Sequence, residues 1–183
     1  SVVAVVPNGA TVKIVDNSKS YPDVPAENRF SDAVAFVSAR NLMDGTTETA
    51  FAPDGPMTNA ALVTALARLD GVPTQGGTTW YAKGMEWAAA RGIGSGAGPD
   101  SNMSGEELIA TLWSYKGSPA VPELPIVGSG AAGNTRTAMA WATKNGIISG
   151  FEPGTLNLQG QITRGQAAQI MMNLVNHPYS SMV

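Results

Sequence analysis

One short stretch of this chain, residues 162–166 (ITRGQ), combines a basic side chain with the pattern of a helix start. Thr163 followed by Gln166 forms a capping box, in which the hydroxyl accepts from an amide of the first turn and the long side chain reaches back. Arg164 then lies at the positive end of the helix dipole, which is mildly unfavourable for a cation. Because its planar fork of donors matches a carboxylate, the pattern favours an anion-binding role for Arg164.

Side chains that could catalyse a reaction or hold a metal are sparse. The sequence has no Cys and one His, His177, which excludes disulfides, thiol nucleophiles and metal sites built from Cys or several His. Glu106 and Glu107 are adjacent at a helix start, whereas glycosidase carboxylates face each other ~5 to 10 Å apart. No serine lies in a nucleophile elbow. We therefore expect a protein that is not an enzyme, with no metal and no cofactor; a cell-wall hydrolase is the weakest alternative.

Composition excludes further classes. The 183 residues are 43% hydrophobic and 14% charged, with a net charge of −3. No run of Lys and Arg supplies the attraction that drives nucleic-acid binding. The longest strictly apolar run, residues 2–6, is far shorter than the ~20 residues of a membrane helix. The chain begins at Ser1 without a signal-peptide pattern, so we expect a piece of a longer protein whose export signal lies outside it or has been removed.

Three segments of the chain align with one another without gaps. They are residues 30–43 (FSDAVAFVSARNLM), 80–93 (WYAKGMEWAAARGI) and 134–147 (NTRTAMAWATKNGI). Apolar residues recur at helical spacing in each segment, which predicts three amphipathic helices. Val37, Trp87 and Trp141 share one position, which favours a core role for both indole rings. Gly92 and Gly146 are suited to a left-handed helix end.

A capped second helix follows each of these segments. Thr58, Ser104 and Thr163 take the cap position, and apolar or aromatic residues stand four, eight and eleven positions after each of them. This spacing predicts a helix with one buried face. Each unit is thus a helix, a glycine-containing loop and a capped second helix that packs on the first.

The linkers between units set the expected boundaries. Residues 71–77 and 117–133 are rich in Pro and Gly, which is typical of connections between folded units. We expect repeats at residues 20–70, 71–117 and 118–177, joined in one domain. Residues 1–19 hold two apolar runs around Asn8-Gly9, a pattern that predicts a short N-terminal β-hairpin and linker.

These repeats resemble the S-layer homology (SLH) domain family. The best match runs from Ala138 to Leu174 and includes the ITRGQ motif. Residues 21–25 (YPDVP) are similar to the opening of a family unit, and Trp80-Tyr81 to the start of its first helix. The resemblance covers about residues 20–177. It implies a mainly α fold, a pseudo-threefold prism with the three first helices at its centre and grooves between neighbouring units.

The resemblance also implies a ligand. In that family the grooves bind secondary cell-wall polysaccharide, often carrying pyruvate ketals, and the motif arginine pairs with the pyruvyl carboxylate. This chain has Arg164 in the third motif but Asn59 and Gly105 in the first and second. We therefore expect at most one strong groove, aided by backbone amides near two glycines of the third unit. The candidate ligand-binding residues are Arg164, Thr163, Gln166, Gly146, Gly150, Asp23 and Trp80.

The expected function is therefore non-catalytic anchoring of a larger exported protein at the cell wall, through an anionic or pyruvylated glycan. Such a module is extracellular, binds no nucleic acid and does not insert into a membrane. Contacts with other domains of the larger surface protein are compatible with this function. The alternative is a structural or self-assembly module of a surface-layer protein whose glycan sites have degenerated, because two of the three motif arginines are absent.

Overall fold

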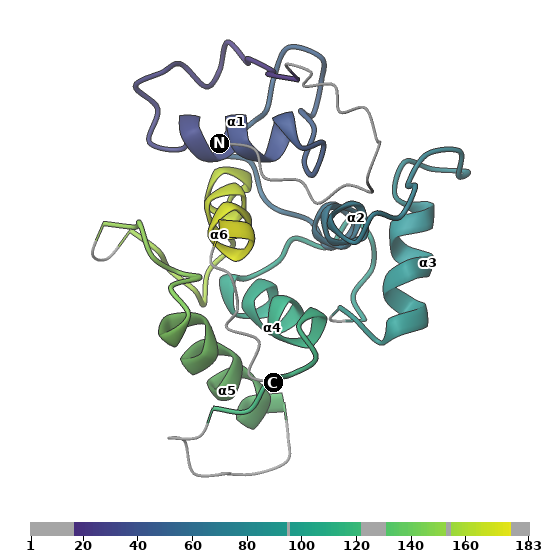
Figure 1. Cartoon of the computed structure of the whole chain (residues 1–183), viewed down its shortest axis with the longest axis vertical. Helices are drawn as coiled ribbons and strands as arrows, with labels where there is room; N and C mark the ends of the chain where they lie inside the picture. Colours follow the sequence, from purple (N-terminus) through teal and green to yellow (C-terminus); the bar gives the residue numbers. More distant parts are fainter. Residues whose placement is uncertain (1–16, 95, 122–130, 153–154, 177–183) are drawn as a thin grey trace, which may run out of the picture.

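The structure is a computed structural model that describes residues 17–94, 96–121, 131–152 and 155–176 (Figure 1). Its six helices are α1 (Ser31–Ala39), α2 (Asn59–Leu69), α3 (Ala82–Arg91), α4 (Gly105–Tyr115), α5 (Ala131–Lys144) and α6 (Arg164–Asn176). Across these ranges there is no strand, only three isolated β-bridges. The mainly α prediction is confirmed. The predicted hairpin lies almost wholly in residues 1–16, outside the described residues.

The predicted caps of the second helices form as hydrogen bonds. In α2 the hydroxyl of Thr58 accepts from an amide of the first turn. In α4, Ser104 and Glu107 make a complete capping box. Gly92, which ends α3, has a φ of 64° in the left-handed region, as predicted from its place after the apolar pattern.

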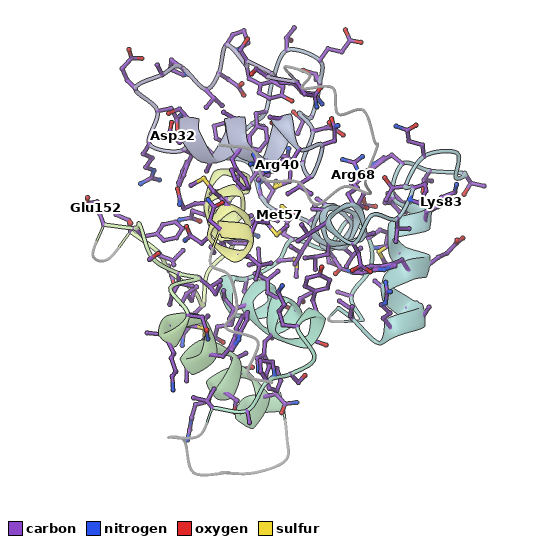
Figure 2. All side chains as sticks on the ribbon, in the orientation of Figure 1. Asp32, Arg40, Met57, Arg68, Lys83 and Glu152 are labelled. Carbon is purple, nitrogen blue, oxygen red and sulfur yellow. The ribbon has the colours of Figure 1, made fainter. Side chains whose placement is uncertain are left out.

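Three backbone hydrogen bonds close a ring at the centre of the molecule. The amide of Met57 donates to the carbonyl of Ile162 at 2.9 Å, that of Ile162 to Met103 at 3.0 Å, and that of Met103 to Met57 at 2.9 Å. All three side chains are buried, and Figure 2 shows Met57 in the interior. We call this set the central ring. Because each member lies two residues before a second helix, the ring joins the starts of α2, α4 and α6.

The second helices, not the first, surround the central ring. Figure 1 shows α2, α4 and α6 inside, with α1, α3 and α5 around them. Eight of the eleven residues of α2 are buried, against three of the ten in α3. The expectation that the first helices lie at the centre is therefore wrong. Apolar spacing showed that both helices have a buried face, but α2 is enclosed on more than one side.

Helices pack across units rather than within them. The main helix pairs are α2 with α3, α4 with α5, and α6 with α1. At the closing pair, a Cβ on Gly165 would lie 2.4 Å from the Phe30 ring, so only glycine permits this approach. The prediction that each second helix packs mainly on the first helix of its own unit is wrong. Periodicity identifies the face that is buried, not the neighbour that buries it.

The recurring positions of the first helices lie in the core, as predicted. Val37, Trp87 and Trp141 have exposed fractions of 0%, 8% and 2%. The two indole rings therefore pack in the interior and present no face to a ligand.

Candidate functional site: a cavity at the start of α6

Each second helix begins against the loop of a neighbouring unit. At α6, the amide of Arg164 donates to the carbonyl of Gly55 and the amide of Gly165 donates to that of Pro53, both at 2.8 Å. We call this contact the α6 joint. Its counterparts are the α2 joint (Asn59 to Ser101, Ala60 to Pro99) and the α4 joint (Gly105 to Gly160, Glu106 to Leu158). Because these first amides already have acceptors, an anion at the α6 joint must be bound by side chains.

The side chain of Arg164 crosses the α6 joint to the loop before α2. Its Nε donates to the carbonyl of Phe51 at 2.9 Å and its Nη2 to the carbonyl of Asp44 at 2.7 Å. The guanidinium carbon lies 4.7 Å from the centroid of the Phe51 ring. Among the described residues, Nη1 has no hydrogen-bond partner. Arg164 is thus held in one position with one donor group left for a ligand.

Burial lowers the pKa of the Arg164 guanidinium from its usual value, against the opposing influence of Tyr21, Asp44 and Asp23. An arginine normally titrates far above neutral pH. Arg164 therefore remains a cation under ordinary conditions, and its charge is partly shielded from water.

The other two joints lack this cation and are closed in different ways. Asn59, which takes the equivalent position in α2, is 2% exposed, and its Nδ2 donates to the carbonyl of Ala97 at 2.8 Å. At Gly105 in α4, a Cβ would lie 2.8 Å from the Cα of Leu158. Leu158 thus occupies the space that an arginine side chain would need.

A cavity of about 450 Å³ lies beside Arg164, within the range of small-ligand sites. It is lined by Leu42, Met43, Asp44, Gly45, Thr46, Ala61, Thr64, Arg68, Trp80 and Arg164. We call it the Arg164 cavity. Trp80, which is 58% exposed, is the only exposed large hydrophobic side chain among the described residues. The cavity therefore combines two arginines with an accessible aromatic ring, contributed by all three units.

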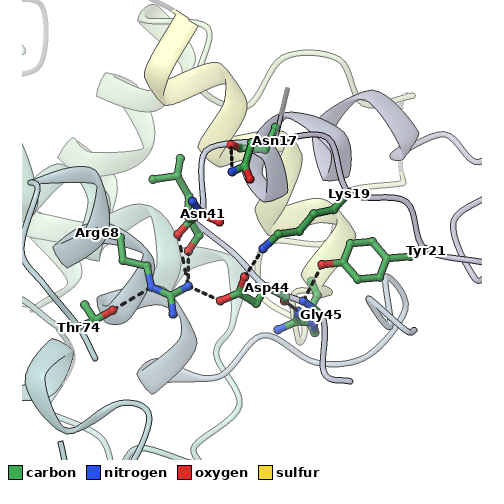
Figure 3. Close-up of polar contacts among 11 residues, drawn as sticks. Asn17, Lys19, Tyr21, Asn41, Asp44, Gly45, Arg68 and Thr74 are labelled. Atoms are coloured by element: carbon green, nitrogen blue, oxygen red, sulfur yellow. Dashed lines mark hydrogen bonds and ion pairs between the residues drawn. The ribbon is translucent and has the colours of Figure 1, made fainter. Parts of the chain in front are cut away.

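Arg68 belongs to an ion-pair network around Asp44. Arg68 Nη1 lies 2.8 Å from Asp44 Oδ2, and Lys19 Nζ lies 2.8 Å from Asp44 Oδ1. Figure 3 shows the two cations pointing to the carboxylate from different sides. Burial raises the pKa of Asp44, but Lys19 and Arg68 outweigh it, and the net pKa is lowered. The network fixes the loop whose carbonyl accepts from Arg164.

Sequence reasoning missed Arg68 and Asp44. A signal existed for Arg68: Ala61, Thr64 and Arg68 follow the i, i+3, i+7 spacing of one helix face, and all three line the cavity. Because a helix face that packs in the core is apolar, the polar side chains of Thr64 and Arg68 on this face indicate a cavity beside it. Asp44 carried no comparable signal, because it lies in an irregular loop.

Asp23 holds the loop that contains Phe51. Its Oδ1 accepts from the amide of Phe51 at 3.0 Å and its Oδ2 from the amide of Ala52 at 2.7 Å. Burial raises its pKa, but these amides outweigh that effect and the net pKa is lowered. Nearby, the hydroxyl of Tyr21 accepts from the amide of Gly45 at 3.0 Å (Figure 3). Both carboxylate oxygens of Asp23 are therefore occupied in holding the loop.

The remaining candidate residues lie outside the cavity lining. The amide of Thr163 donates to Gln166 Oε1 at 3.0 Å, and the amide of Gln166 to Thr163 Oγ1 at 3.2 Å. This is the predicted capping box. Gly146 and Gly150 lie after α5, with positive φ of 65° and 83°. The structure thus brings Arg164 and Trp80 to the lining of one cavity; the ligand-binding roles of all the candidates stay predictions.

Two further features bear on the function. The described residues contain no group of three or more His, Asp or Glu side chains placed to hold a metal ion. None of the described helices has the length and apolar character needed to cross a membrane.

Two segments of the chain match the model of a known family. The family model of the S-layer homology domain matches residues 20–61 and 127–168. These two segments are similar to the S-layer homology domain. The first match contains α1 and the loop with Phe51, and the second contains α5 and the start of α6 with Arg164. Both sides of the α6 joint therefore lie in segments that match this family model, whereas α3 and α4 lie outside these two matches.

Two curated proteins are similar to most of the chain. The chain is 26% identical over 181 residues to an amylopullulanase of Thermoanaerobacterium thermosulfurigenes, covering 86% of this chain and 10% of that enzyme. It is 23% identical over 183 residues to exoglucanase XynX of Acetivibrio thermocellus, covering 88% of this chain and 17% of that enzyme. The chain thus spans a small part of the length of each of these curated relatives.

Proposed function

We propose that this chain is a non-catalytic module that anchors a larger exported protein at the cell wall by binding an anionic, pyruvylated polysaccharide in the Arg164 cavity. SLH domains are cell-wall anchoring modules, which supports the general role. The observation that carries the specific proposal is the cavity itself, where Arg164 and Arg68 lie with the exposed ring of Trp80.

The cavity has the chemistry that a pyruvyl carboxylate needs. Nη1 of Arg164 is a free charged donor among the described residues, and hydrogen bonds from a charged donor are stronger than neutral ones. The Phe51 ring lies against the guanidinium, an arrangement that favours the cation. Trp80 offers an apolar face against which a sugar ring packs. Asp23 acts as a positioning residue, since it holds the Phe51 loop in place.

The proposal includes one binding site per chain. The α2 joint is closed around buried Asn59 and the α4 joint around Leu158. The three units then serve as one domain, whose repeats at 20–70, 71–117 and 118–177 form a pseudo-threefold prism. The cyclic hydrogen bonds of the central ring support this arrangement.

The closed joints also favour a second candidate function. A module with degenerate sites would serve self-assembly of a surface-layer protein, with contacts between copies or neighbouring domains in place of glycan. This candidate requires that the Arg164 cavity bind no polysaccharide, so one titration separates the two.

The test is calorimetric titration of the chain with purified pyruvylated wall polysaccharide and with the same polymer after removal of pyruvate. We expect saturable binding at one site for the first and at least about tenfold weaker binding for the second, because a charged hydrogen bond contributes about 1.5–3 kcal/mol. Trp80→Ala should weaken binding without unfolding the chain, since Trp80 is exposed. Arg136→Ala, at an exposed position outside the cavity, is the matched control.

Two results would overturn the proposal. Equal binding of both polymers would show that the pyruvyl group is not recognised. No binding of either polymer by the folded wild-type chain would favour the self-assembly function.

A further inference from the structure

A second cavity adjoins the Arg164 cavity. It has a volume of about 570 Å³ and is lined by Lys19, Arg40, Asn41, Asp44, Arg68, Gly71, Val72, Pro73, Thr74 and Gln75. We call it the Arg40 cavity. The two cavities share Asp44 and Arg68. The ion pair between these two residues therefore lines both cavities, and we call it the wall.

The Arg40 cavity is basic although the whole chain is acidic. Lys19, Arg40 and Arg68 line it with Asp44 as the one carboxylate, while the chain has a net charge of −3. Asp44 is already bridged by Lys19 and Arg68. An incoming anion therefore meets a net positive surface, and the carboxylate in the wall is compensated by two cations.

Arg40 is fixed in place without a carboxylate partner among the described residues. Its Nη1 donates to the carbonyl of Phe36 at 3.3 Å, and its guanidinium carbon lies 3.6 Å from the centroid of the Phe36 ring. Holding a cation in one rotamer lowers the entropy that a ligand contact would otherwise cost. Arg40 is thus a preorganised cation that lines only the Arg40 cavity, as Arg164 lines only the Arg164 cavity.

The rest of this lining is suited to sugar hydroxyl groups. Asn41 and Gln75 are exposed, and their side-chain amides have no hydrogen-bond partner among the described residues. Each amide supplies donors and an acceptor. Thr74 is different, because its hydroxyl already accepts from Arg68 Nε at 3.0 Å.

We propose that the two cavities bind one continuous stretch of polysaccharide that carries at least two acidic groups, one at Arg164 and the other at Arg40, across the Arg68–Asp44 wall. This inference rests on the proposed function and extends it. It identifies the ligand as an extended polyanionic segment of the wall polymer, so that a single acidic sugar fills only the Arg164 cavity.

The test compares a monosaccharide that carries one pyruvate ketal with an oligosaccharide of the same polymer that carries two. The wild-type chain should bind the oligosaccharide about two to five times more tightly, the gain expected from one additional ion pair at an exposed arginine. Arg40→Glu should remove this gain and leave the affinity for the monosaccharide unchanged. Arg136→Glu, an equal charge reversal at an exposed position outside both cavities, should change neither affinity.

Salt and a milder variant give independent readouts. Affinity for the oligosaccharide should fall more steeply with salt than affinity for the monosaccharide, because more exposed charge pairs are screened. Arg40→Gln should reduce this difference in slope. Thermal unfolding of each variant shows whether the loss of the Phe36 contact has altered the fold, and Arg40→Gln keeps the test valid if Arg40→Glu does not fold.

The outcomes separate this inference from the proposed function. If both sugars bind with equal affinity and the folded Arg40 variants behave as wild type, while Trp80→Ala still weakens binding, the Arg40 cavity is no part of the site and the proposed function stands. If the folded wild-type chain binds neither sugar, the proposed function is overturned and this inference with it.

Discussion

Arg164 Nε lies 2.9 Å from the carbonyl oxygen of Phe51, although 113 residues separate the two in sequence. The backbone amide of Phe51 donates to Asp23 Oδ1 at 3.0 Å. The Phe51 backbone is thus held at both ends by charged groups, one from α6 and one from the segment before α1. Arg164 has a structural role as well as a proposed ligand, and experiments must separate the two.

Replacing Arg164 should lower stability. Arg164→Ala removes two hydrogen bonds from a charged donor to backbone carbonyls, and we expect a loss of about 2 kcal/mol in the free energy of unfolding. Urea denaturation followed by circular dichroism measures it. Arg136→Ala should stay within about 0.5 kcal/mol of wild type, as is usual at exposed sites. An unchanged urea midpoint for Arg164→Ala would mean that these hydrogen bonds contribute nothing.

Stability should depend on the ionisation of Asp23. Because two amides lower its folded-state pKa, its contribution is present above the usual value of about 4 and is lost as the pH falls through the folded value. Asp23→Asn should therefore be less stable than wild type near about pH 7, and the difference should shrink towards about pH 3. Urea midpoints at both values measure the effect. Asp100→Asn is the control at an exposed turn, and a gap that stays constant with pH would contradict the assignment.

The close approach of α6 to α1 should not tolerate a methyl group. In Gly165→Ala the new Cβ would lie 2.4 Å from the Phe30 ring, and overpacking of this kind costs about 1–3 kcal/mol. Gly98→Ala provides the comparison, since its Cβ would meet its nearest neighbour at 3.7 Å. Thermal unfolding should show a lower midpoint for the first variant and little change for the second. Equal midpoints would show that α1 and α6 can move apart without cost.

Restoring an arginine to the second motif should not create a second glycan site. In Gly105→Arg the side chain must displace Leu158, whose Cα lies 2.8 Å from the position of a Cβ. We expect lower stability and, in a titration with pyruvylated polysaccharide, a stoichiometry that remains one. A stoichiometry of two would show that the missing arginine, rather than Leu158, closes the α4 joint.

Local features of the fold were predictable from sequence, and long-range ones were not. The caps at Thr58, Ser104 and Thr163 follow from residue types within one turn. The central ring was not predictable in this way. Its hydrogen bonds join backbone groups of Met57, Met103 and Ile162, and every residue type carries the same carbonyl group. The exchange of helix partners was missed for a related reason: an apolar face is compatible with any complementary neighbour.

The candidate site was predictable in part. Arg164 and Trp80 lie in recognisable repeat positions, and both line the cavity. Asp44 is joined to Arg68 across 24 residues, and neither residue belongs to a repeated motif. The sequence also did not predict that Leu158 fills the space at the α4 joint, because Gly105 indicates only that the motif arginine is absent.

The contact between α1 and α6 joins the two ends of the series of described helices. These helices are the first and the last of those described, and they close the circle of helix pairs. Arg164 is the first residue of α6, and its partners Phe51 and Asp44 lie in the loop that follows α1. A pulling force that separates α6 from α1 therefore also dismantles the Arg164 cavity. We therefore expect mechanical separation of this helix pair to weaken polysaccharide binding at the proposed site.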